Sequence, residues 1–307
     1  MKIISSINYK GGVGKTTLTA NLCVGLAMRG KRILMVDMDP QASLTFSFIK
    51  PEDWSTKFSD GKTIKAWFDN RASGESSFPL SNIIYPLDKI NRQYKGKIDL
   101  IMSHLGLINV DLDLATELGG GTKQKITLNF LKVHSMLKGA FEKEINNNEY
   151  DYIIIDCPPN FNVSTKNAIV ASDHLLIPAK PDYLSTLGID YLLQQVKGLK
   201  AEYNESVQYL DHKNFKEIDP KPLGVIFTMV EYYGGAPIAA LSQYISQTKK
   251  KGIPLFTAQM RDNKTLFSGA PAYGEPVIMS NSSQNTHKAI VQELNAIVDE
   301  FMKLETA

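Results

Sequence analysis

The chain has 307 residues, of which 43% are hydrophobic and 21% charged, and its formal net charge is +2. This composition is typical of a globular protein with a sizeable core, and the charge balance does not by itself indicate nucleic-acid binding. Its two cysteines, Cys23 and Cys157, form no Cys-x-x-Cys pair, which argues against an iron–sulfur site. Without a secretory pattern or a run of transmembrane length, we expect a cytoplasmic protein.

The first predicted elements are a buried strand and a helix. Residues 2–7 are short, apolar and β-branched, as in a buried parallel strand. From residue 17 to 29, Leu18, Leu22 and Leu26 recur at helical spacing. Gly30 follows as a C-terminal cap.

The loop between these elements has the composition of a phosphate-binding loop, with an additional lysine at its start. It consists of Lys10, Gly11, Gly12, Val13, Gly14, Lys15, Thr16 and Thr17. Glycines let backbone N–H groups approach an anion closely, and the N-terminus of the following helix adds partial positive charge. Lys15 can then reach the β- and γ-phosphates of a nucleotide, and the Thr16 hydroxyl can hold Mg²⁺.

Acidic residues follow two further predicted strands. Residues 32–36 end in Asp37-Met38-Asp39-Pro40-Gln41, and residues 152–155 lead into Asp156-Cys157-Pro158-Pro159. Ligands of open α/β sheets bind beyond the carboxyl ends of the strands, so both clusters should lie beside the loop. One carboxylate can position a metal ion or its waters, and another can orient an attacking water. A lone aspartate there could be a helix N-cap, but three around one lysine-bearing loop favour a catalytic site.

The rest of the chain alternates between strand and helix patterns, which predicts an α/β fold with a doubly wound, mostly parallel sheet flanked by helices. We expect strands near residues 98–102, 173–177, 223–228 and 254–256. We expect helices near residues 62–70, 107–117, 123–146, 163–171, 185–203, 236–251 and 286–304. Residues 51–97 have no clean period and are predicted to be an insertion, with a short helix near 63–68, in a single domain spanning 1–307.

These motifs together resemble the Walker A, A′ and B motifs of the ParA/MinD family of ATPases. The three stretches are Lys10 to Thr17, Asp37-x-Asp39-Pro40-Gln41 and Asp156-x-Pro158-Pro159, and the lysine before the glycines resembles the family's "deviant" Walker A loop. Similarity continues through residues 98–103, 178–193, 224–230 and 261–277, so it covers most of the chain. The resemblance implies a P-loop ATPase that uses ATP and Mg²⁺.

The resemblance also implies roles for individual residues. Lys15 would contact the phosphates, Asp39 would orient the hydrolytic water, and the metal shell would comprise Thr16, Asp37 and Asp156. Lys10 would cross the interface of an ATP-bound homodimer and contact the partner's nucleotide, since phosphoryl transfer needs positive charge that is often delivered in trans. Adenine contacts are expected in late loops, at Met229 and Arg261.

The implied function is that of a ParA-type partition or cargo-positioning ATPase. ATP would drive dimerisation and nonspecific DNA binding on the nucleoid, and a centromere-binding or cargo adaptor protein would stimulate slow hydrolysis. The phosphate loop begins within ten residues of Met1, so we expect no N-terminal helix-turn-helix. DNA contacts would then be sequence-independent. The candidates are Lys249, Lys250 and Lys251, although lysines at a helix C-terminus also satisfy the helix dipole.

Two alternatives remain open. One is a MinD-like or accessory ATPase switch that acts on a membrane or a protein assembly, and the other is an enzyme that uses ATP for chemistry on a small molecule. MinD-like relatives end in a basic amphipathic helix, whereas the last predicted helix here has an acidic polar face that anionic lipid would repel. Its apolar residues favour packing on the sheet, and we expect no membrane partner; they are Ile290, Leu294, Ile297 and Phe301.

Overall fold

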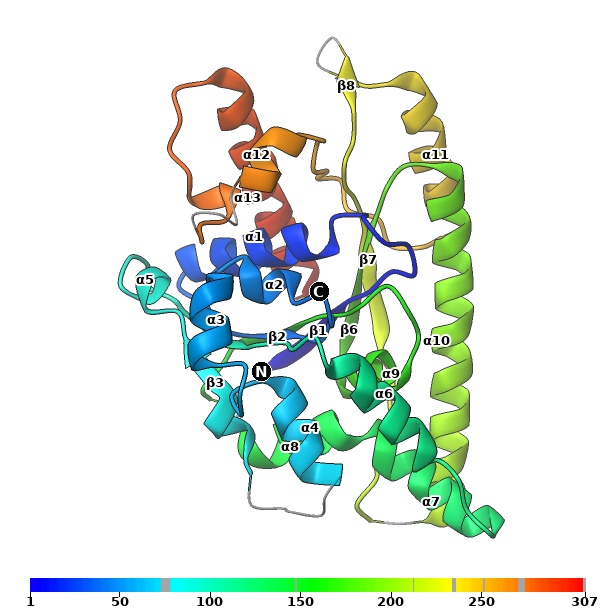
Figure 1. The fold of residues 1–307 in the computed structure, drawn as a ribbon. Coiled ribbons are helices and arrows are strands. Elements are labelled where there is room, and N and C mark those ends of the chain that lie inside the picture. Colours follow the sequence, from blue (N-terminus) through cyan, green and yellow to red (C-terminus); the bar gives the residue numbers. More distant parts are fainter. Residues whose placement is uncertain are drawn as a thin grey trace.

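The computed structural model describes residues 1–72, 78–146, 148–211, 213–233, 236–250, 252–269 and 274–305. At its centre is a seven-stranded sheet with the order β3-β4-β2-β5-β1-β6-β7 (Figure 1). The strands are β1 (Lys2–Ser6), β2 (Arg32–Asp37), β3 (Ile84–Pro86), β4 (Lys97–Ile101), β5 (Tyr152–Asp156), β6 (His174–Ala179) and β7 (Lys221–Phe227). All neighbours are parallel except β3, which pairs antiparallel with β4 at one edge. The predicted doubly wound, mostly parallel sheet is confirmed.

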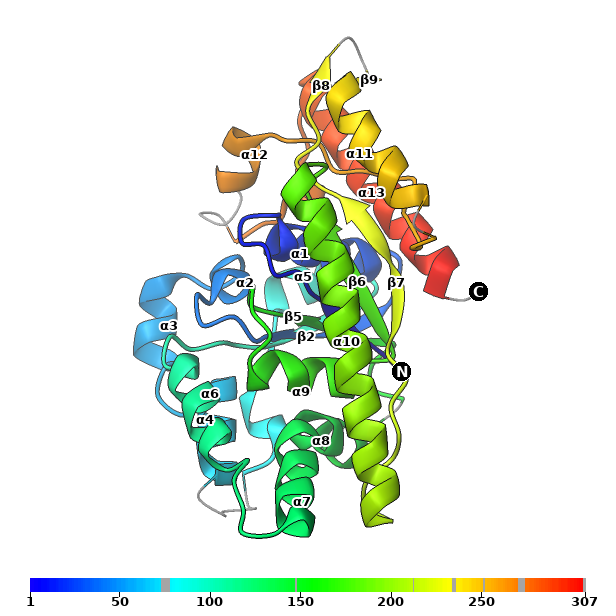
Figure 2. The same ribbon diagram turned by 90° about the vertical axis from the view of Figure 1, so that its right-hand side faces the viewer.

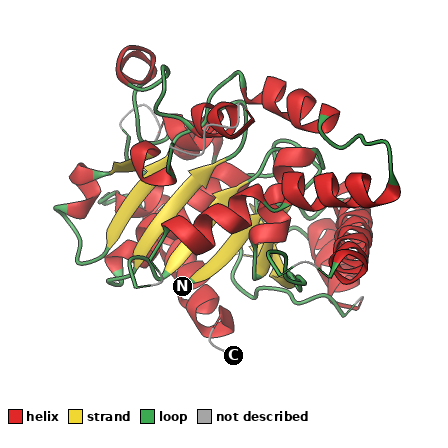
Figure 3. Ribbon diagram, turned by 90° about the horizontal axis from the view of Figure 1, so that it is seen from below, coloured by secondary structure: helices red, strands yellow, loops and turns green. Residues whose placement is uncertain are grey.

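Helices cover both faces of the sheet because strand residues alternate between two cores (Figure 3). In β5, Ile153 and Ile155 enter one core, while Tyr152 and Ile154 enter the other. The first core is covered by α4 (Ile64–Ala72), α6 (Leu107–Thr116), α7 (Lys123–His134), α8 (Met136–Glu144), α9 (Val163–Ala171) and α10 (Tyr183–Leu210). The second is covered by α1 (Lys15–Met28), α2 (Ser43–Phe46), α3 (Pro51–Lys57), α5 (Asp88–Asn91) and α13 (Asn285–Glu305).

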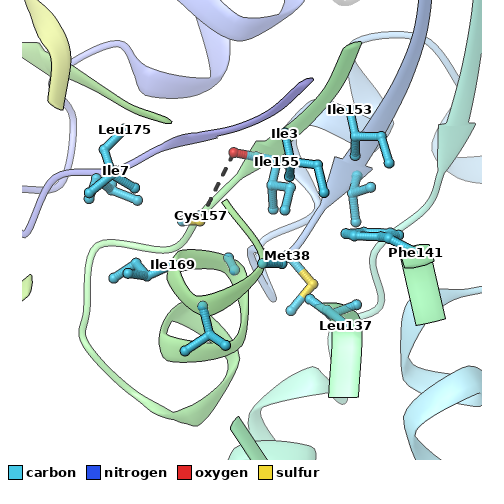
Figure 4. Close-up of a cluster of buried hydrophobic side chains, with 14 of the residues drawn as sticks. Ile3, Ile7, Met38, Leu137, Phe141, Ile153, Ile155, Cys157, Ile169 and Leu175 are labelled. Atoms are coloured by element: carbon cyan, nitrogen blue, oxygen red, sulfur yellow. Dashed lines mark hydrogen bonds between the residues drawn. The ribbon is translucent and has the colours of Figure 1, made fainter. Parts of the chain in front are cut away.

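Both cysteines are free and buried, and they pack as small apolar residues. Cys157 lies among apolar side chains of the first core (Figure 4). Its Sγ lies 4.0 Å from the carbonyl oxygen of Ile155, and burial raises the pKa of its thiol. A buried thiol with a raised pKa is a poor nucleophile, so Cys157 fits packing rather than chemistry.

Of the remaining elements, the first precedes β3 and the others lie in the C-terminal part of the chain. They are η1 (Leu80–Ile83), the hairpin of β8 (Tyr232–Tyr233) and β9 (Ala236–Pro237), α11 (Ala239–Lys250), α12 (Lys264–Gly269) and η3 (Val277–Met279). Within the described ranges, no helix combines the length and the apolar character needed to cross a bilayer.

Several predicted boundaries were wrong for local reasons. The helix predicted over 123–146 is two helices, because the chain breaks at Ser135, whose hydroxyl donates to the Leu131 carbonyl oxygen at 2.6 Å. The strand predicted near 254–256 supplies only one bridge, between Leu255 and Val225. The helix predicted over 185–203 begins earlier and continues to Leu210.

The segment from 51 to 97 contains more structure than its sequence indicates. It supplies α3, α4, η1, β3 and α5, and it buries Trp54, Trp67, Phe68 and Leu80. Most of these elements are too short to display a hydrophobic period, and each anchors to the core through a few large side chains.

Candidate functional site

The phosphate-binding loop connects β1 to α1. Gly12 and Gly14 have φ values of 67° and 74°, in the left-handed region that favours glycine. A Cβ on Gly14 would also lie 3.3 Å from Met260 Cε. No acidic residue occupies the first turn of α1. The partial positive charge of the free N–H groups and of the helix dipole therefore faces the loop without a carboxylate in that turn to neutralise it. The loop is therefore built to hold an anion.

Lys15 lies inside this loop, with only 7% of its surface exposed. Its ammonium donates to the backbone carbonyl oxygens of Asn8, at 3.2 Å, and Lys10, at 3.3 Å. Burial lowers the pKa of Lys15, and the negative charges of Asp156 and Asp39 act against that shift. A buried ammonium held mainly by carbonyls suits a phosphate oxygen as a further partner.

Asp156 and Asp37 lie side by side, because β5 and β2 pair in register at these two residues. Asp156 accepts hydrogen bonds from Thr16 Oγ1 at 2.6 Å and from Thr19 Oγ1 at 3.4 Å. Burial raises the pKa of both carboxyl groups, and the charge of Asp156 raises that of Asp37 further. A divalent cation would compensate this buried charge, and the carboxylate and hydroxyl oxygens suit Mg²⁺. Thr16 and Asp156 are thus brought together as predicted.

Both oxygens of Asp37 already have protein donors. Its Oδ2 accepts from the backbone N and the Oγ1 of Thr45, both at 2.7 Å, and its Oδ1 accepts from the backbone N of Asp39 at 3.2 Å. Asp37 therefore supports the loop after β2, and a place behind the direct metal ligands fits it better than direct ligation.

Asp39 is half-buried at the start of this loop. Its Oδ1 accepts from the backbone N of Gln41 at 2.9 Å. The backbone N of the preceding residue, Met38, donates to the carbonyl oxygen of Asp156 at 2.9 Å, which brings Asp39 to the edge of the sheet where the phosphate-binding loop lies. The charge of Asp39 also raises the pKa of Asp156 and acts against the lowering of the Lys15 pKa. This position fits the predicted role of orienting a water.

Lys10 turns away from the loop toward the N-terminus of α10. Its Nζ contacts the two carboxylate oxygens of Asp182 at 2.8 and 3.0 Å and the hydroxyl of Ser185 at 3.2 Å. Asp182 is also the N-cap of α10, since its Oδ1 accepts from the backbone N of Ser185 at 2.8 Å. Sequence reasoning missed Asp182, although an aspartate immediately before a helical pattern is an N-cap signal.

Exposed apolar side chains adjoin Lys10 along the first turns of α10, a long helix on the outside of the molecule (Figure 2). We call them the α10 stripe: Tyr183, Leu184, Leu187 and Tyr191. Tyr191 also contacts Tyr9, which precedes Lys10, with ring centroids 5.2 Å apart. The stripe is thus joined to the phosphate-binding loop.

The late loops approach the site from β7. Thr228 Oγ1 donates to the backbone carbonyl oxygen of Val13 at 2.6 Å, and Met229 has a left-handed φ of 52°. Arg261 lies nearby, but Glu293 of α13 engages its guanidinium, with Nε to Oε1 at 2.8 Å, and Tyr232 lies under it at 4.8 Å. Contacts of Met229 and Arg261 with adenine stay predictions.

The proposed DNA-contact residues lie at the end of α11. Lys249 and Lys250 are exposed in the last turn of that helix, and Lys251 lies outside the described residues. The last described helix, α13, buries Ile290, Leu294, Ile297 and Phe301 against α1 and the sheet, so its predicted packing is confirmed.

Comparisons with known proteins agree with this geometry. The family model described as AAA domain matches residues 1–209. An uncharacterized protein of Methanocaldococcus jannaschii is 33% identical over 265 residues, which are 83% of this chain and 91% of that protein. The sporulation initiation inhibitor protein Soj of Bacillus subtilis is 28% identical over 278 residues, 91% of this chain and 90% of Soj.

A solved structure, the ATP complex of Cyanothece McdA, superposes with a TM-score of 0.67 at 20% identity, covering 99% of this chain and 96% of that one. At this identity the likeness bears on the fold alone. The match of the family model to residues 1–209, by contrast, indicates common ancestry with that family. The chain belongs to the AAA domain family and is a member of the ParA/MinD superfamily of ATPases.

Proposed function

We propose that the chain is a ParA-type ATPase switch that binds ATP with Mg²⁺, pairs as a homodimer across the nucleotides, and then binds DNA without sequence preference. A centromere-binding or cargo adaptor protein would stimulate slow hydrolysis and release the dimer. This cycle would take place in the cytoplasm, on the nucleoid, and would partition DNA or position another cargo. Relatives named Soj and chromosome partitioning protein ParA support the assignment.

The observation that carries the proposal is the position of Lys10. Its ammonium lies on the rim of the phosphate-binding loop, next to the α10 stripe, rather than inside the loop with Lys15. Leu184 is 66% exposed in that stripe. A charged group beside exposed apolar side chains suits a face that a second copy of the chain covers. Across such a face, Lys10 would supply positive charge to the partner's phosphates.

The protein's own residues account for the chemistry at the loop. The backbone N–H groups from Gly11 to Thr16 and the Lys15 ammonium would hold the phosphates, and Thr16 and Asp156 would hold Mg²⁺, which neutralises charge on the β- and γ-phosphates when bound. Asp39 would accept a hydrogen bond from the attacking water and so orient it.

DNA contact is assigned to the lysines at the end of α11. Lys249 and Lys250 project into solvent, where they can meet phosphates without recognising bases. Lys251, beyond the described residues, belongs to the same run. Pairing two copies would double the number of such contacts, which is how dimerisation strengthens DNA binding.

The proposal is tested with the Asp39→Ala variant, which should bind ATP but not hydrolyse it. We expect this variant to bind duplex DNA of arbitrary sequence with ATP and not with ADP, and to lose affinity steeply between about 50 and about 200 mM salt. The matched control is the Asp39→Ala protein that also carries Lys249→Gln and Lys250→Gln. It should dimerise with ATP equally well but bind DNA more weakly.

Absence of DNA binding by an ATP-bound dimer would refute the DNA-carrier function. It would leave an ATPase switch acting on a protein assembly or a membrane surface. Absence of an ATP-dependent dimer would refute the switch itself, and formation of a product from a small acceptor would indicate a metabolic enzyme of the superfamily.

A further inference from the structure

A ring of hydrogen bonds joins the loop after β2 to the end of β4. Thr45 donates to Asp37 from its backbone N and its Oγ1, and the backbone N of Asp39 donates to the other oxygen of Asp37. Ser103 closes the ring: its backbone N donates to Thr45 Oγ1 at 2.9 Å, and its Oγ donates to the carbonyl oxygen of Asp39 at 2.6 Å. The backbone of Asp39 is therefore held at both its N–H and its C=O.

Ser103 is itself fixed from the opposite side. Its carbonyl oxygen accepts from Trp54 Nε1 at 3.2 Å, and the carbonyl oxygen of Met102 accepts from the backbone N of Ile64 at 2.9 Å. Ser103 and Thr45 are completely buried, and Trp54 is nearly so. The hydroxyl of Ser103 thus projects from a rigid point, and fully satisfied buried networks of this kind specify a single geometry.

The loop after β2 needs such support. Pro40 has no N–H to contribute, and Ala42 adopts a left-handed φ of 53°, which costs energy in a residue with a Cβ. The backbone N of Ala42 also donates to the carbonyl oxygen of Asp39, at 2.8 Å. That oxygen would keep one donor if the Ser103 hydroxyl were removed, so removal should loosen Asp39 without leaving a buried carbonyl unpaired.

We propose that Ser103 is a positioning residue for ATP hydrolysis, whose hydroxyl fixes Asp39 beside the phosphate-binding loop, with Thr45 completing the ring. This inference rests on the proposed role of Asp39. Ser103 does not touch the nucleotide or the water in this assignment; it acts through the backbone of Asp39. Its removal should therefore slow the chemical step and leave nucleotide binding nearly unchanged.

The test compares Ser103→Ala with the unaltered protein in single-turnover hydrolysis and in ATP–Mg²⁺ binding. We expect the rate to fall about ten- to a hundredfold, because small misplacements of an orienting group are costly. The Kd for ATP should change by less than about threefold. Ser172→Ala is the matched control, since Ser172 is also buried and donates to a carbonyl oxygen, that of Ala168, at 2.7 Å, but lies before β6 at the other end of the sheet.

A double variant separates positioning from general damage. Ser103→Ala should not lower the residual single-turnover rate of Asp39→Ala any further, whereas an effect independent of Asp39 would lower that residual rate by the same factor as in the unaltered protein. If Ser103→Ala does not fold, Thr45→Val, which breaks the ring, and Thr45→Ser, which keeps it, provide the same comparison.

Three results would overturn the inference. The first is a normal hydrolysis rate for Ser103→Ala when Asp39→Ala is inactive, which leaves the ATPase function standing. The second is an equal loss in Ser103→Ala and Ser172→Ala. The third is normal hydrolysis by Asp39→Ala, which removes the role of Asp39 and the inference with it.

Discussion

The ion pair between Lys10 and Asp182 should oppose dimerisation, because Lys10 must leave Asp182 before it can contact a partner's nucleotide. The perturbation that tests this is Asp182→Asn. It removes the charge that holds Lys10 but keeps a side-chain oxygen that can accept from the backbone N of Ser185, so the N-cap of α10 survives. A change in the dimer Kd of Asp182→Asn can then be attributed to loss of the ion pair.

The magnitude follows from the exposure of the pair. The side chains of Lys10 and Asp182 are 35% and 38% exposed, so solvent screens the contact and it is worth about 0.5–1 kcal/mol. Two copies release two such pairs, which gives about 1–2 kcal/mol per dimer, or about a five- to thirtyfold lower dimer Kd for Asp182→Asn.

Sedimentation of the Asp39→Ala protein with ATP, with and without Asp182→Asn, measures this Kd while hydrolysis is blocked. The Lys10→Ala/Asp182→Asn protein is the control, and it should show no gain because the lysine that is released is missing. A dimer that is unchanged or weaker in Asp182→Asn would refute the reasoning and would indicate that Asp182 itself stabilises the dimer.

The other predictions concern neighbouring features. Lys10→Ala should retain ATP binding, measured by calorimetry, because Lys15 and the loop backbone are intact, while hydrolysis falls at least about tenfold; normal turnover would exclude the trans role. Leu184→Glu should weaken the ATP dimer about tenfold or more by burying a charge in the α10 stripe, with unchanged ATP affinity, and an unaffected dimer would place the interface elsewhere. Thr228→Val should weaken ATP binding about three- to tenfold through loss of the hydrogen bond to Val13, and Thr228→Ser should not. Burial lowers the pKa of His134 from 6.5 to about 4, so protonation favours the unfolded chain as pH falls below 6.5. From pH 7 to pH 5 the unaltered protein should lose about 2 kcal/mol more unfolding free energy than His134→Leu in urea titrations, and equal losses would contradict this.

The phosphate-binding loop could be predicted from sequence because its requirements are local. Gly12 and Gly14 are needed at positive φ, and Lys15 and Thr16 follow at fixed spacing. The flanking strand and helix are each recognisable from the pattern of apolar residues in their own segments. Asp156 could be placed beside the loop because parallel strands end at one edge of the sheet. These inferences need only neighbouring residues and one topological rule.

The partner of Lys10 could not be predicted in the same way. Asp182 lies 172 residues further along the chain, and the contact depends on β6 pairing with β1. Arg261 shows the same limit, because its pairing with Glu293 depends on where α13 packs. A motif indicates what a side chain can do, whereas its partner in the folded chain is set by the order of the strands.

Ser103 lies between these two cases. Strands β2 and β4 are parallel neighbours whose register pairs Val36 with Ile101, so the residues just beyond these strands also lie side by side. That register brings Ser103, two residues beyond β4, against the loop that carries Asp39, two residues beyond β2. Had the neighbouring strands been known, the sequence alone would have indicated the contact, because a buried serine needs an acceptor and the loop offers the Asp39 carbonyl. The strand order therefore converts a serine of no evident function into a residue on which the geometry of hydrolysis is expected to depend.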